Sequence, residues 1–252
     1  MMAAETAVGR GDARVARVWA MTPRTTRLIA LAGLASFVLI VVAAFVAPPL
    51  WNAPGTTASS ARVAAYAQED RGQTIASLVI YTLGMGLFLC FAAGLWSWLR
   101  QIEPVPQPLS AMFAFGAVAL VVLILAAFVT GGLLAYRPQE AEIAATLADT
   151  TFGLLAISGM PTAVCLGAYA ALVFRHGALP RWTAWLAVLG AVAHIFITAS
   201  LVSHGSFLSL EGSVIIWVPA TFFAWILATS LALMRTGAEV DRWASDGALD
   251  RN

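Results

Sequence analysis

The chain has 252 residues, of which 60% are hydrophobic and only 11% are charged. This composition lies outside the range of soluble globular domains. The formal net charge of +1 excludes a surface built for nucleic acid, which needs concentrated positive charge. We therefore expect an integral membrane protein that contacts membrane lipid and, as an alternative, another membrane protein, but no nucleic acid.

Six stretches of the chain contain no Asp, Glu, Lys or Arg, and together they hold 172 of its 252 residues. Each is long enough for the roughly 20 apolar residues that cross a bilayer as a helix. Backbone polar groups in hydrocarbon must bond within their own segment, which favours helices over open strands. The pattern predicts an all-α fold, a polytopic six-helix transmembrane bundle with helices near residues 28–46, 74–99, 109–135, 150–174, 182–202 and 213–234.

The helices form one transmembrane domain, 28–234, between an Arg-rich tail at 1–27 and a second tail at 235–252. The first hydrophobic stretch follows two arginines, as a secretory signal does. It is too long for a signal sequence, however, and Pro48 and Pro49 stand where cleavage is expected. We therefore predict that it is an uncleaved first helix.

The arginines predict the orientation of the bundle. With the N-terminus inside, the inner segments carry eleven arginines and the outer loops carry three. Because basic residues are enriched on the cytoplasmic side, both termini are expected in the cytoplasm.

The two larger outer loops each contain a helix-like stretch. Residues 60–71 follow a serine suited to cap a helix, and they place Val63, Tyr66 and Ala67 on one face. The acidic stretch before Asp149 in the second loop is expected to run directly into the fourth transmembrane helix.

Small residues recur at four-residue spacing in three helices, as they do where membrane helices pack closely. We expect these stripes to face the bundle interior: Gly86, Cys90 and Gly94; Gly159, Ala163, Gly167 and Ala171; Ala220, Ala224, Ala228 and Ala232.

Two prolines lie within predicted membrane helices. Pro161 and Pro219 each remove a backbone donor and clash with the preceding turn, so both are expected to bend their helices. The bends are either ordinary kinks or parts of a substrate path like those of transporters.

His194 is the titratable group deepest in a predicted membrane helix, and helical spacing places it on one face with Gly190 and Thr198. Ionisable groups at this depth are candidates for ligand contact or proton relay. The alternative is a neutral imidazole bonded within the bundle.

At the outer surface, Asp149, His204 and Glu211 are candidates for a polar patch, although ordinary loop polarity also explains them. Asp149 suits a helix N-cap as well. The sequence contains no recognisable catalytic triad, phosphate-binding loop or metal-ligand spacing. We assign no catalytic residues, metal or cofactor.

Three segments carry a resemblance: 61–72 (ARVAAYAQEDRG), 149–164 (DTTFGLLAISGMPTAV) and 177–182 (GALPRW). With them the chain resembles a broad group of uncharacterised multi-pass membrane proteins common in actinobacteria. The resemblance implies a helical bundle in a bacterial inner membrane and assigns no functional residues.

Three functions remain open from the sequence. The first is a binding or accessory protein that contacts lipid, a small apolar ligand or a membrane partner. The second is a small transporter or channel subunit with a path near His194. The third is a membrane enzyme acting at the outer face, although the scarcity of catalytic patterns favours a protein without enzymatic activity.

Overall fold

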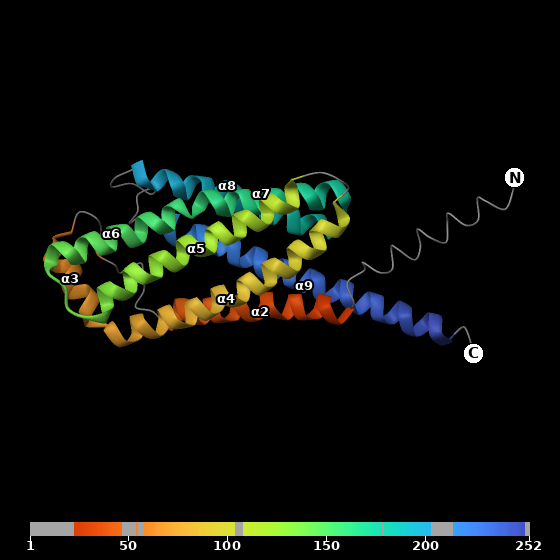
Figure 1. The fold of residues 1–252 in the computed structure, drawn as a ribbon, viewed down its shortest axis with the longest axis horizontal. Helices are drawn as coiled ribbons and strands as arrows, with labels where there is room; N and C mark the ends of the chain where they lie inside the picture. Colours follow the sequence, from red (N-terminus) through yellow and green to blue (C-terminus); the bar gives the residue numbers. More distant parts are fainter. Residues whose placement is uncertain are drawn as a thin grey trace, which may run out of the picture.

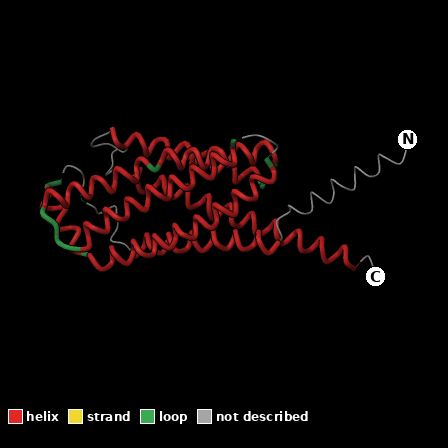
Figure 2. The backbone as a smooth tube through the Cα atoms, viewed as in Figure 1, coloured by secondary structure: helices red, strands yellow, loops and turns green. Residues whose placement is uncertain are grey.

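The computed structural model describes residues 23–46, 54, 58–103, 108–177, 179–202 and 214–249. Within these residues all regular structure is helical and there is no strand, as Figure 2 shows. The elements are α2 (Pro23–Val46), α3 (Ser60–Glu69), α4 (Arg71–Ile102), α5 (Leu109–Tyr136), α6 (Ala141–Ile157), α7 (Gly159–His176), α8 (Arg181–Thr198), the 3₁₀ turn η2 (Ala199–Val202) and α9 (Val214–Leu249). The predicted all-α class is confirmed.

Six segments of the described chain are long and apolar enough to cross a membrane. One of them joins α6 and α7, and another joins α8 and η2. The protein is therefore a membrane-embedded helical bundle. The segments are Arg24–Phe45, Arg71–Ile102, Leu109–Tyr136, Ala141–His176, Arg181–Val202 and Trp217–Thr236.

The spanning helices form a closed ring. In order around it, α2 packs on α4, α4 on α5, α5 on α7, α7 on α8, α8 on α9, and α9 again on α2. Helix α2 begins and α9 ends at one end of the bundle, whereas α3 lies at the opposite end (Figure 1). We call these the α9 end and the α3 end.

Aromatic side chains fill the inside of the ring. Trp225 of α9 is fully buried, and its ring centroid lies 5.1 Å from that of Tyr169 and 5.8 Å from that of Phe222. Such tilted and stacked ring pairs add to the energy of burial. We call the whole set the aromatic core: Phe88, Phe91, Phe113, Tyr169, Phe222 and Trp225.

Helices α2 and α4 are joined by hydrogen bonds from side chains to backbone. The Ser36 hydroxyl donates to the Gly84 carbonyl oxygen at 2.8 Å, and the Ser77 hydroxyl donates to that of Ala43 at 2.9 Å. A Cβ at Gly84 would lie 2.9 Å from a side-chain carbon of Ile40. The missing side chain therefore lets the two backbones approach closely.

The structure has two consecutive helices where the sequence predicted one continuous fourth helix. Because Pro161 has no N–H, the carbonyl of Ile157 has no donor four residues later; α6 ends at Ile157 and α7 begins at Gly159. The Ser158 N–H still donates to the Leu154 carbonyl at 3.0 Å. Pro161 thus stands beside a helix break, and the acidic stretch runs into the span as expected.

The last helix also differs from the sequence prediction. Pro219 lies inside α9, which continues through it without a break. Helix α9 runs on to Leu249, beyond the predicted end at residue 234. The added residues contain no further proline and include several good helix formers.

Helix α3 covers part of the α3 end. The Ser59 hydroxyl accepts a hydrogen bond from the Arg62 N–H at 3.4 Å and so caps the helix. Val63 and Ala67 are buried, and the Gln68 side chain donates to the Leu134 carbonyl at 3.3 Å. The short loop helix predicted from the sequence is thereby attached to α5.

Candidate functional site

His194 lies in the interior of the bundle with 6% of its surface exposed. Its Nδ1 is 2.8 Å from the carbonyl oxygen of Gly190, one turn earlier in α8. Its ring meets that of Phe222 at 6.1 Å in an edge-on arrangement. Gly159 of α7 lies directly against the backbone carbonyl of His194 and the side chain of Thr198. The face of α8 that carries Gly190, His194 and Thr198 therefore lies between α7 and α9.

The bond to Gly190 selects the tautomer of the neutral imidazole. A carbonyl oxygen only accepts, so Nδ1 carries the hydrogen and donates it, which leaves the lone pair on Nε2. Thr198 donates to the carbonyls of His194 and Ala156, both at 3.3 Å. The three predicted residues thus bond mainly to backbone, which favours a structural role for His194.

Replacing His194 by leucine is expected to change the free energy of unfolding by less than about 1.5 kcal/mol, as volume-conserving core exchanges do. The Gly190 carbonyl keeps its helical donor, the N–H of residue 194, so no buried acceptor is left unpaired. Thermal unfolding in mild detergent, followed by circular dichroism, measures the change. A folded variant with reduced proton flux in liposomes would contradict the structural role.

A buried chain of hydroxyl groups joins three helices in the half of the bundle nearer the α9 end. The Tyr169 hydroxyl donates to Thr183 Oγ1 at 2.8 Å, and Thr183 donates to the Pro180 carbonyl at 2.8 Å. Thr229 of α9 donates to the Tyr169 hydroxyl at 3.4 Å. These hydroxyl groups satisfy one another's hydrogen-bonding capacity, and their bonds connect α7, α8 and α9. The sequence analysis did not identify it.

Of the three residues predicted to form the outer polar patch, Asp149 is the one that the structure describes, and the patch stays a prediction. Asp149 is exposed and lies within α6, nine residues after Glu140, which is the N-cap residue of that helix. The N-cap role considered for Asp149 is therefore wrong. His204 and Glu211 lie outside the described residues.

In the described part of the chain, no group of three or more His, Cys, Asp or Glu side chains is placed to hold a metal ion. Cys165 is buried, whereas Cys90 is exposed on the outside of the ring. The two thiols therefore do not face a common space with His194.

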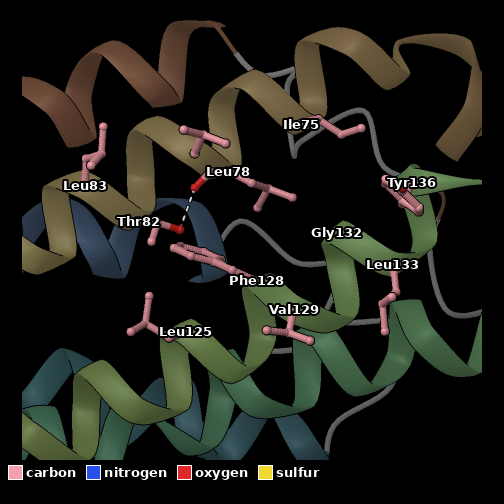
Figure 3. Close-up of a pocket in the computed structure, with 11 residues that line it drawn as sticks. Ile75, Leu78, Thr82, Leu83, Leu125, Phe128, Val129, Gly132, Leu133 and Tyr136 are labelled. Atoms are coloured by element: carbon pink, nitrogen blue, oxygen red, sulfur yellow. Dashed lines mark hydrogen bonds between the residues drawn. The ribbon is translucent and has the colours of Figure 1, made fainter.

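The bundle carries a groove that the sequence analysis did not find. It lies between the first part of α4 and the last part of α5 and has a volume of about 580 Å³ (Figure 3). Pockets that bind small molecules commonly have volumes of this order. The lining residues are Ile75, Leu78, Val79, Thr82, Leu83, Leu125, Phe128, Val129, Gly132, Leu133 and Tyr136.

The walls of this α4/α5 groove are apolar almost throughout. Thr82 brings a hydroxyl to the lining, but that hydroxyl donates to the Leu78 carbonyl at 2.8 Å, as the dashed line in Figure 3 shows. Tyr81 packs on Phe128 with ring centroids 5.3 Å apart and fixes one wall. Such a surface suits a hydrocarbon chain and offers little to a polar solute.

Gly132 keeps the groove open. A Cβ at this position would have as its nearest neighbour a side-chain carbon of Leu78, 3.7 Å away across the groove. A larger side chain would extend into the space between α4 and α5. Gly131 faces α6 instead, because its Cβ would lie 3.5 Å from Thr151.

One end of the groove has a polar boundary. Tyr136, the last residue of α5, lines the groove and is about two-thirds exposed. The guanidinium carbon of Arg71, the first residue of α4, lies 5.9 Å from the centroid of the Tyr136 ring. Amphipathic rings and arginines at helix ends are typical of the membrane interface.

No family model, curated protein or solved structure matches the chain. The resemblance to the actinobacterial membrane proteins stays a prediction.

Proposed function

We propose that this protein is an accessory membrane protein that binds the apolar chain of a membrane lipid in the α4/α5 groove. The observation that carries the proposal is the groove itself, about 580 Å³ in volume and lined by aliphatic and aromatic side chains. The tightly packed aromatic core supplies a rigid support, because Tyr81, which packs on Phe128 of the groove lining, lies on the same helix as Phe88 of the core.

The proposal includes a location and an orientation. We propose a bacterial inner membrane because of the resemblance to the actinobacterial membrane proteins. We also propose that both termini lie in the cytoplasm, which the bias of eleven arginines against three supports. In that orientation the α3 end is on the outer side. The groove lies near the start of α4 and the end of α5, so it opens toward the outer leaflet.

A leucine at position 132 is expected to lower the amount of co-purified lipid by about tenfold or more, because its side chain fills the groove beside Leu78. The protein is extracted in mild detergent, and the bound lipid is counted by native mass spectrometry. An unchanged lipid ratio in Gly132→Leu would contradict binding in the groove.

Gly153→Leu is the matched control. Gly153 lies in α6, and no heavy atom lies within 4 Å of the position that a Cβ would take. The same glycine-to-leucine change in a membrane helix is expected to leave the bound lipid as in the natural chain. Loss of lipid from both variants would show a general effect on the bundle and would count against the groove.

A further inference from the structure

Arg71 stands at the polar end of the groove. Its side chain is exposed, and its guanidinium carbon lies 5.9 Å from the centre of the Tyr136 ring, which lines the groove. Among the described residues no carboxylate forms an ion pair with it. A cation that has no ion-pair partner among the described residues therefore borders an apolar space.

The chemistry of this cation selects a class of partner. A guanidinium binds phosphate through paired N–H donors, and its contact with an aromatic face leaves these donors free for such a bond. Arg71 is also the first residue of α4, and the Asp70 side chain makes no capping bond there. The positive end of the helix dipole therefore adds to the charge of the arginine.

The distance along α4 from Arg71 to the groove fits the spacing between the phosphate and the acyl chains of a phospholipid. Ile75, the first groove residue, follows Arg71 by four residues, which is about 6 Å along the helix axis. The groove continues from Ile75 to Leu83, which adds about 12 Å of helix. A phospholipid with its phosphate at Arg71 therefore has its acyl chains beside the apolar lining. This is the order in which a phospholipid lies in a membrane, with the phosphate at the surface and the chains deeper.

From this arrangement we infer that the ligand of the groove is a glycerophospholipid, with its phosphate on Arg71 and an acyl chain between α4 and α5. The inference rests on the proposed function and names the class of its ligand. It excludes neutral lipids such as diacylglycerol as the preferred occupant, because they carry no group for the guanidinium.

Acidic residues near Arg71 reduce the preference that its positive charge alone would give to anionic headgroups. Glu69 and Asp70 are exposed next to Arg71. Burial and then the charges of Asp70 and Glu69 raise the pKa of the Tyr66 phenol above its ordinary value, so both carboxylates lie near Tyr66 as well as beside Arg71 in the sequence. They reduce the net positive field, and a headgroup with an added amine is therefore accepted alongside an anionic one.

The test compares lipids that have the same acyl chains and differ only in the headgroup, which contains a phosphate in two of them and is absent from the third. The full chain in mild detergent is incubated with equal amounts of phosphatidylglycerol, phosphatidylethanolamine and diacylglycerol with the same acyl chains, and retention is measured by native mass spectrometry. Each phospholipid is expected to be retained about tenfold or more over diacylglycerol, as a charge-assisted hydrogen bond provides.

Arg71→Gln is expected to reduce that preference to near one while diacylglycerol retention stays unchanged. Arg62→Gln is the matched control, since Arg62 is also exposed at the α3 end, whereas the contact with the Tyr136 ring at the end of the groove is made by Arg71. An equal preference in Arg71→Gln and the natural chain, or no preference in the natural chain, would overturn the phosphate assignment.

Gly132→Leu separates the two proposals. If it reduces retention of all three lipids while Arg71→Gln leaves the preference intact, lipid binding in the groove stands and the role of Arg71 fails. If Gly132→Leu changes the retention of none of them, the proposed function fails, and any phosphate preference then arises elsewhere on the protein.

Discussion

Replacing Trp225 by alanine is expected to destabilise the bundle by about 3 to 5 kcal/mol, the range for removing a buried aromatic side chain. Trp225 is fully buried and touches rings from three other helices: Phe91 of α4, Phe113 of α5 and Tyr169 of α7. Alanine would leave a cavity where these helices meet. The surrounding rings are held on rigid helices and would refill it only in part.

The measurement is thermal unfolding in mild detergent, with the folded fraction confirmed by gel filtration. Trp217→Ala is the matched control, because Trp217 lies on the same helix with 68% of its surface exposed. It is expected to unfold close to the natural chain. Equal unfolding temperatures for the two variants would show that the aromatic core does not carry the stability of the ring.

The position of the spans could be predicted from the sequence because charge is costly in hydrocarbon. Stretches free of Asp, Glu, Lys and Arg mark the spans, and the structure has its six membrane-length segments in the same places. The ends were less well predicted. Helix α4 begins at Arg71 and α9 continues to Leu249, since helices continue into water where polar residues still favour them.

The faces that pack together were harder to predict. Gly86 and Cys90 are exposed on α4, contrary to the expected stripe, whereas Gly84 contacts α2. Likewise Ala220 and Ala224 are exposed while Ala228 and Ala232 are buried. Lipid is as apolar as the bundle interior, so hydropathy does not tell the two faces of a helix apart.

The candidate site was missed for the same reason. The α4/α5 groove is lined by side chains such as Leu78 and Val129, which are ordinary in any membrane helix. Its only distinctive signals are Gly132 within α5 and the pair of Arg71 and Tyr136 at the helix ends. Arg71 lies 61 residues before Gly132 and 65 residues before Tyr136 in the sequence, and only the pairing of α4 with α5 brings them together.

Replacing Gly116 by valine is expected to cost about 3 kcal/mol, at the upper end of the usual range for overpacking. A Cβ at Gly116 of α5 would lie 2.8 Å from the Pro161 carbonyl oxygen and 2.9 Å from the Cys165 backbone nitrogen. Both neighbours are backbone atoms of α7, so no side-chain rotation relieves the clash. The two helices would have to move apart, next to the break between α6 and α7.

Gly86→Val separates this clash from the change in helix propensity that accompanies any replacement of glycine by valine. Gly86 lies inside α4 on an exposed face, and no heavy atom lies within 4 Å of the place where a Cβ would stand. Position 86 therefore receives the same valine side chain, but its Cβ has no close neighbour to clash with. We expect Gly86→Val to unfold near the temperature of the natural chain and Gly116→Val to unfold well below it. If both unfold alike, α5 and α7 do not pack as closely as the contact at Gly116 requires, and the closed ring would be wrong at that point.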